Sequence, residues 1–228
     1  MRSAARSAKL LLLSATLIPA LCWNTRAFCA AENAPALPKY EVTGFRDVRF
    51  GMTEPEVRAA ATKSLSLKPA DITSSVNPVE GTSVLTAKVS ALDPAPGPAK
   101  VAYIFGYASK KLIQVNVIWG EEPSTPPPDV TAMIGAGTRL GQYFAGFAWK
   151  KDSTRLGVPV GENTVVLFTG DDEKKGAVRL IADGVKFQIQ RDGNPTTSPE
   201  PKGSPKLIIN YISDRENPDI AKIAPGKF

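Results

Sequence analysis

Few residues of this 228-residue chain can do chemistry, and it contains no histidine. His-based catalytic triads, proton relays and His-ligated metal sites are therefore excluded. Three adjacent acids, Asp171, Asp172 and Glu173, carry the hard oxygen ligands that suit Ca²⁺. They lack the spaced acids and the distal glutamate of an EF-hand loop, and Lys174 and Lys175 follow them directly. We therefore expect a solvated hairpin turn at this point, and the sequence predicts no metal and no cofactor.

Three other segments resemble catalytic or cofactor motifs only superficially. The glycines of GAGTRLG (135–141) are spaced one residue too widely for a dinucleotide fingerprint, and prolines precede them. A serine beside two lysines (109–111) falls at an expected turn, where a desolvated nucleophile is not formed. The acids of residues 214–219 surround an Asn-Pro turn. The sequence thus predicts that the protein is not an enzyme, although carboxylates paired only in space stay open as an alternative.

Aromatic side chains are the remaining candidates for a binding surface. Tyr103, Phe105 and Trp119 fall in predicted strands, and Tyr143 and Trp149 fall on or after a predicted helix. Such residues are usually core, but aromatic anchors also dominate interface energetics. If one sheet face is uncovered, we expect these five residues to form a partner-binding patch.

The first 31 residues have the three parts of a signal peptide. Basic residues precede an uncharged run at 10–23, and small residues follow at 29–31. The run is shorter than a membrane-spanning helix, and it lacks a convincing lipoprotein box. We expect residues 1–31 to be removed on export to the periplasm, which leaves no transmembrane segment.

Removal of this leader changes the chemistry of the chain. Both cysteines, Cys22 and Cys29, are lost, and the formal net charge falls from +6 to +2. A charge this small gives no support to nucleic-acid binding, which needs a clustered basic surface. The expected partner is a periplasmic or envelope protein.

Hydrophobic spacing divides the rest of the chain into two similar units. After a disordered lead-in (32–44), the first unit (45–120) contains a helix that starts at Thr53 with a capping box to Glu56. Period-two strands follow from Ser83, around 101–105 and around 113–119, where Ile113, Val115, Val117 and Trp119 are expected on one face.

A Pro-rich linker (121–128) precedes the second unit (129–228). This unit has a helical pattern from Val130 to Phe147, in which Gly135, Gly141 and Gly146 are expected to allow close approach to a sheet. Strands are predicted at 165–169, 177–182, 185–190 and 206–212. Segments 101–118 and 165–181 share a glycine and a Lys-Lys pair between two strands, which indicates an internal repeat.

The segment FRDVRFGMTEPEV (45–57) resembles the start of small bacterial envelope proteins, in which a Gly-Met-Thr/Ser-x-x-Glu-Val turn opens a helix before a β-meander. The SmpA/OmlA outer-membrane assembly lipoproteins and the tandem β-lactamase-inhibitor-protein-like fold share this signature. Segments 111–120 and 211–228 look like uncharacterised periplasmic proteins of proteobacteria. The resemblance implies a compartment and an architecture, and it suggests secreted enzyme inhibition as one function.

We therefore expect an α+β protein with two helix-plus-antiparallel-meander units, whose sheet is covered on one face by helices. The expected function is non-enzymatic binding or scaffolding in the periplasm through a sheet face. The alternatives are a secreted enzyme inhibitor and a small-ligand or metal-binding protein or carboxylate-dependent enzyme.

Overall fold

The computed structural model describes residues 36–121, 129–186, 200–222 and 226, and Ala36–Phe228 form one compact unit. The predicted signal peptide and nearly all of the predicted linker lie outside the described residues. The chain starts with a short hairpin of β1 (Gly44–Phe45) and β2 (Val48–Arg49), followed by α1 (Glu54–Leu65). Thr53 and Glu56 form the predicted cap, because the Glu56 carboxylate accepts hydrogen bonds from the Thr53 N–H and hydroxyl at 2.7 and 2.6 Å.

Eight antiparallel strands form one sheet in the order β3-β4-β5-β6-β10-β9-β8-β7. In chain order the strands are β3 (Ile72–Val76), which follows the 3₁₀ turn η1 (Pro69–Asp71), β4 (Ser83–Val89), β5 (Ala99–Phe105), β6 (Leu112–Trp119), β7 (Arg155–Pro159), β8 (Thr164–Asp171), β9 (Ala177–Lys186) and β10 (Glu200–Ile212).

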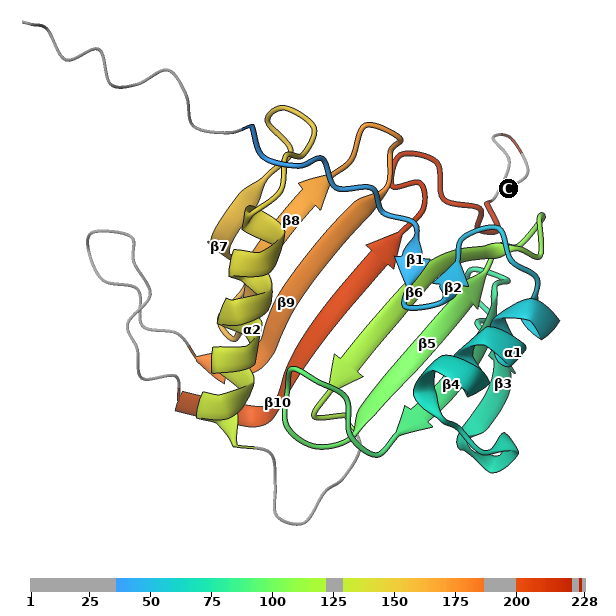
Figure 1. The fold of residues 1–228 in the computed structure, drawn as a ribbon, viewed down its shortest axis with the longest axis horizontal. Coiled ribbons are helices and arrows are strands. Elements are labelled where there is room, and N and C mark those ends of the chain that lie inside the picture. The colour runs from blue at the N-terminus through green and yellow to red at the C-terminus, as the bar shows by residue number, and fades with distance from the viewer. Residues whose placement is uncertain (1–35, 122–128, 187–199, 223–225, 227–228) are drawn as a thin grey trace, which may run out of the picture. The chain divides into compact units, whose positions relative to one another are not determined.

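The two halves of the chain have the same order of elements, a helix followed by four strands. The last strand of each half, β6 or β10, lies at the centre of the sheet, and these two strands pair with each other in an antiparallel register. The halves therefore join into a single sheet. The predicted α+β class and the antiparallel sheet with helices packed on it are confirmed (Figure 1).

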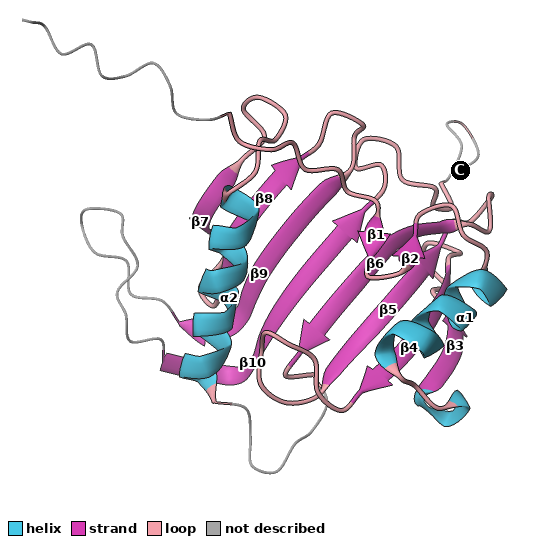
Figure 2. Cartoon of the chain, viewed as in Figure 1, coloured by secondary structure: helices cyan, strands magenta, loops and turns pink. Residues whose placement is uncertain are grey.

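Helix α2 (Val130–Ala145) packs against β8, β9 and β10, while α1 packs near β4 on the same side of the sheet (Figure 2). Asp129 caps α2 by accepting a hydrogen bond from the Thr131 N–H at 2.9 Å. The close contact with the sheet occurs at Gly137, where a Cβ would lie 2.6 Å from Leu167 Cδ1. At the three glycines for which it was predicted, a Cβ would lie 3.3 Å or more from its nearest neighbour: Gly135, Gly141 and Gly146.

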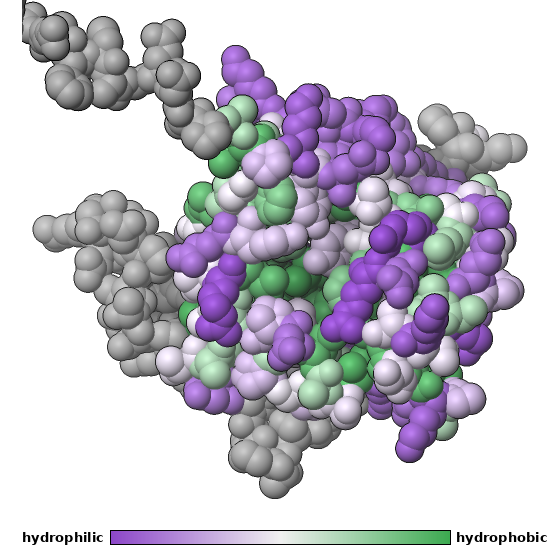
Figure 3. Space-filling model, in the orientation of Figure 1, coloured by the Kyte–Doolittle hydropathy of each residue, from purple (hydrophilic) through white to green (hydrophobic). Residues whose placement is uncertain are grey.

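The core lies between the sheet and the helices. Side chains at alternate strand positions face this side, and Val101, Val117 and Leu207 are each fully buried there. Figure 3 views the molecule from this side: apolar residues gather in the hollow between the two helices, and hydrophilic residues are mixed with others around it. The strands thus turn their most apolar face toward the helices.

The structure differs from the sequence prediction at four strands. The edge strands β3 and β7 were not predicted, because β3 is mostly polar and β7 contains Gly157 with a φ of +61°. Residues 185 and 186 continue β9 rather than starting a new strand, and residues 187–190 lie outside the described part. A register shift places Leu112, not Ile113, opposite Phe105, and Leu112 is the buried residue.

Candidate functional site

One face of the sheet carries no helix among the described residues. Successive side chains of a strand point to opposite faces of the sheet. In β9, Val178 and Leu180 are buried on the helix side, so Arg179 and Ile181 point to the opposite face. Strand register extends this assignment across the sheet, because residues directly opposite each other share a face. We call this surface the helix-free face.

Two rows cross the centre of the helix-free face. The aliphatic row follows the register from β8 to β6 and consists of Val166, Ile181, Ile208 and Ile118. The polar row runs beside it and consists of Thr169, Arg179, Asn210 and Asn116. It is offset by two residues on β9, β10 and β6 and by three on β8, where a register shift adds one residue. The rows are separated by about 7 Å, the spacing of two residues along a strand. Ile181, Ile208 and Ile118 are partly exposed, whereas Val166 is buried.

The polar row has a defined hydrogen-bond arrangement at the junction of the two halves. Asn116 Oδ1 accepts one bond from Asn210 Nδ2 and one from Gln114 Nε2, each of 2.8 Å. Thr169 Oγ1 is buried and has no hydrogen-bond partner. The row therefore combines fixed amides in the centre with a hydroxyl that no described group satisfies.

The C-terminal segment 213–222 lies at one end of this face. Small pockets of about 240 and 230 Å³ lie beside it, and both are lined by Gln114 and Ile212 together with Pro218 of the segment. Asp219 holds the segment in place by accepting hydrogen bonds from the Ala108 and Ser109 N–H groups, both at 2.9 Å.

These contacts also change the acidity of Asp219. The hydrogen bonds from the Ser109 side chain and from the two backbone N–H groups favour the charged form, so they lower the pKa of this carboxyl. A Cβ on Gly106 would overlap the same carboxylate. The glycine of the predicted repeat thus makes room for the C-terminal segment.

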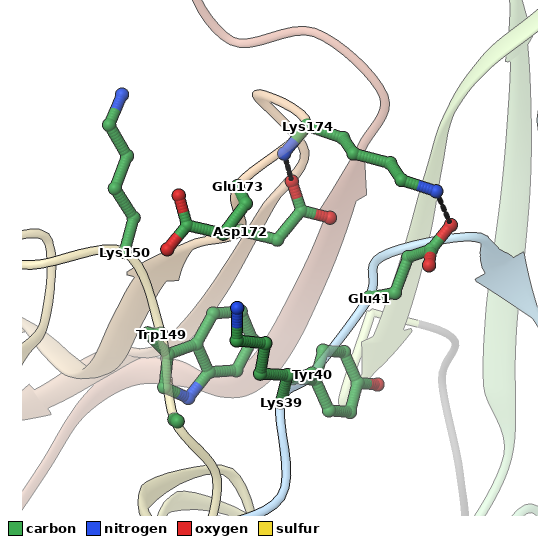
Figure 4. Close-up of a pocket in the computed structure, with 9 residues that line it drawn as sticks. Lys39, Tyr40, Glu41, Trp149, Lys150, Asp172, Glu173 and Lys174 are labelled. Carbon is green, nitrogen blue, oxygen red and sulfur yellow. Dashed lines mark hydrogen bonds and ion pairs between the residues drawn. The ribbon is translucent and has the colours of Figure 1, made fainter.

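A second candidate is a pocket of about 260 Å³ beside the N-terminal segment (Figure 4). Its wall is a ring pair, Tyr40 stacked on Trp149 with centroids 4.8 Å apart. Burial, with a smaller contribution from Tyr143, raises the pKa of Tyr40 to about 12. Glu41 and Lys174 at its rim form an ion pair of 2.7 Å. The two rings thus already pack on each other, and the two charged side chains already form an ion pair.

Asp172 lines that pocket and has a structural role. Only 3% of this residue is exposed, and its carboxylate accepts hydrogen bonds of 2.8 Å from the N–H groups of Val42, Lys174 and Gly176. It therefore fastens the N-terminal segment to the β8–β9 turn. Among the predicted acids, Asp171 instead pairs with Arg215 at 2.8 Å, and Glu173 is exposed.

The aromatic patch predicted from the sequence is not formed. Tyr103, Phe105 and Trp119 are at most 1% exposed, because they point toward the helices and not toward the helix-free face. Burial raises the pKa of Tyr103, whose hydroxyl has no hydrogen-bond partner among the described residues, and Trp119 Nε1 donates to Leu92 O at 2.8 Å.

The other two members of the predicted patch lie around α2. Tyr143 is 55% exposed on the helix, and Trp149 is partly buried against Tyr40, Phe144 and Phe168. The rows on the helix-free face were not predicted as a site. Their signal in the sequence was the alternation of Gln114 and Asn116 with buried residues, together with the apolar pattern of residues 177–182.

Within the described ranges, no group of three or more His, Cys, Asp or Glu residues is arranged to hold a metal ion. No helix in that part of the chain is long and apolar enough to cross a membrane. The fold and the site define an α+β protein with one broad antiparallel sheet that is covered by helices on one side. No protein-family model, no curated protein and no solved structure matches the chain.

Proposed function

We propose that this is an exported, non-enzymatic binding protein, which acts in the periplasm through the helix-free face on a protein partner. The observation that carries the proposal is the aliphatic row. Ile181, Ile208 and Ile118 lie side by side across three neighbouring strands, partly exposed, on a face without a helix. Partly exposed aliphatic side chains gain free energy when a partner removes them from water.

The size of the face suits such a role. Eight strands at about 4.8 Å spacing and about seven residues in length give a surface of about 900 Å². A stable protein complex buries about 800 Å² on each partner. The helix-free face is thus large enough to form a specific complex without a contribution from the rest of the molecule.

The arrangement of polar groups favours binding over catalysis. Asp172 makes three hydrogen bonds to backbone N–H groups, and Asp219 accepts bonds from two. The pocket beside Tyr40 has an ion pair between Glu41 and Lys174 at its rim. These carboxylates hold the chain together, whereas a general base needs access to a substrate proton.

Site-specific photo-crosslinking in cells that produce the full chain tests the proposal. A benzophenone amino acid replaces Ile208 on the helix-free face or, as the matched control, Ala59 on the exposed surface of α1. We expect a discrete protein adduct from position 208 that is absent from position 59. Equal adducts from both positions, or none from position 208, would refute the proposal.

Enzyme inhibition is a specific form of the same function, and it is the one that the resemblance to inhibitor-like folds implies. It uses the same face and differs only in the partner. If the adduct contains a secreted enzyme, its activity is measured with and without the purified protein. Loss of activity on mixing, restored by Ile208→Asp, supports inhibition; unchanged activity supports scaffolding.

A further inference from the structure

Arg179 occupies the centre of the polar row and differs from the other arginines that the structure describes. Each of the others donates to a carboxylate, hydroxyl or carbonyl oxygen: Arg46, Arg49, Arg58, Arg139, Arg155 and Arg215. Arg179 is partly buried in the middle of β9, and no hydrogen bond or ion pair joins it to another described residue. Its five donors are therefore not used by any residue in the described part of the chain.

The neighbours of Arg179 reinforce this property. Thr169 lies directly opposite on β8 with its buried hydroxyl unpartnered, and Asn210 lies directly opposite on β10. The Oδ1 atom of Asn116, the next residue of the row, already accepts two hydrogen bonds. Donors thus outnumber free acceptors around Arg179, and a guanidinium cannot accept a hydrogen bond. The complementary group is an anion with acceptor oxygens.

The acids of this face do not supply that group. Asp171 is diagonal to Arg179 in the register, but Arg215 Nη1 contacts both of its carboxylate oxygens at 2.8 and 3.2 Å. Asp183 lies four residues along the same strand, a distance of about 13 Å, and accepts a hydrogen bond from Thr164. The charge of Arg179 is therefore not balanced by either of these acids.

We infer that Arg179 is the anchor of the helix-free face and that the protein partner presents an Asp or Glu carboxylate to it, next to aliphatic side chains that cover Ile181 and Ile208. This inference rests on the proposed function and names the chemistry of its partner. A planar guanidinium binds a carboxylate through two parallel hydrogen bonds, which gives direction as well as energy.

A protein partner fits better than an anionic lipid surface. The aliphatic row lies within a sheet face and does not project as an insertion helix or loop would, and membrane-surface binding depends on burying apolar side chains about 5 to 10 Å deep. Asp171 and Asp183 on the same face also disfavour a negatively charged membrane. A carboxylate with aliphatic neighbours matches both rows at their spacing of about 7 Å.

Two measurements test the inference. The first is an NMR titration of the purified chain with a matched probe pair, N-acetyl-glutamate amide and N-acetyl-glutamine amide, which have the same shape and differ in one charge. We expect the glutamate probe alone to shift the Arg179 side-chain N–H signal, with weaker shifts at higher salt. Equal shifts from both probes, or shifts from inorganic phosphate only, would overturn it.

The second measurement repeats the crosslinking from position 208 in Arg179 variants. R179Q is expected to reduce the adduct on the order of tenfold, since loss of a charge pair at an interface costs at least that much, and R179K to retain part of it. Lys63→Gln, which removes the same charge from exposed α1, is the control and leaves the adduct unchanged. An adduct that is equally strong in R179Q and K63Q refutes the anchor but not the proposed function. Absence of any adduct from position 208 when Arg179 is intact refutes the proposed function, and the titration still decides the anchor.

Discussion

Replacing Asp172 by alanine is expected to release the N-terminal segment and to destabilise the whole protein. The carboxylate accepts three backbone hydrogen bonds of 2.8 Å, and removing it leaves the N–H groups of Val42 and Gly176 without this acceptor in a buried place. Hydrogen bonds to a charged group each contribute about 1.5 to 3 kcal/mol. Because the exposed Lys174 N–H can turn to water, we expect a loss of about 3 kcal/mol in the free energy of unfolding.

The assay is urea unfolding of the chain without residues 1–31, followed by circular dichroism. With a denaturant slope of about 2 kcal/mol/M, the midpoint is expected to fall by about 1.5 M. Asp214→Ala is the matched control, because Asp214 Oδ1 also accepts two backbone bonds, from Glu216 and Asn217, but in an exposed turn. Amide hydrogen exchange at Val42 reports the local effect.

If Asp172→Ala and Asp214→Ala lower the midpoint equally, the carboxylate does not fasten the segment and the reasoning fails. It also fails if the Val42 amide stays as protected in Asp172→Ala as in the unmodified chain.

Three further outcomes follow from the structure. Gly137→Val is expected to lower stability by about 1 to 3 kcal/mol, since its side chain must displace Leu167; thermal unfolding measures this, and no change in Tm would contradict the packing. The lowered pKa of Asp219 gives stability that is present above its unfolded value of 3.8 and is lost as the pH falls through the lower folded value. Asp219→Asn should therefore make the urea midpoint fall less steeply with decreasing pH in the acid range. The raised pKa of Tyr40 gives stability that is full below pH 10 and lost as the pH rises toward about 12. Burial also raises the pKa of Tyr103 and Tyr211, so Tyr40→Phe should reduce the late phenolate absorbance by the amplitude of one tyrosine, and an unchanged amplitude would refute the assignment.

Local signals in the sequence predict the elements of this fold well. The caps at Thr53 and Asp129 act within a few residues, and both helices start where these signals place them. Strand alternation likewise predicts which residues of β5 share a face with Tyr103. It does not predict which face the helices cover, and this is why the aromatic patch was assigned to the wrong environment.

The candidate site depends on register, which local patterns do not contain. Arg179 and Asn116 belong to one row only because β9 pairs with β10 and β10 pairs with β6, strands separated by many residues in the chain. A register change of one residue would move each side chain to the opposite face. The individual residues were visible in the sequence, whereas their neighbourhood is a property of the complete sheet.

The central position of β10 has a consequence for how the chain folds. This strand joins β6 to β9, and its residues follow those of β6 by about ninety positions. Ribosomes deliver the chain from its N-terminus, so the middle of the sheet is closed by a segment that arrives near the end of synthesis. Contacts so distant along the chain slow folding. Until β10 is in place, β6 and β9 each have an open edge, and such an edge exposes the incomplete chain to pairing with other strands.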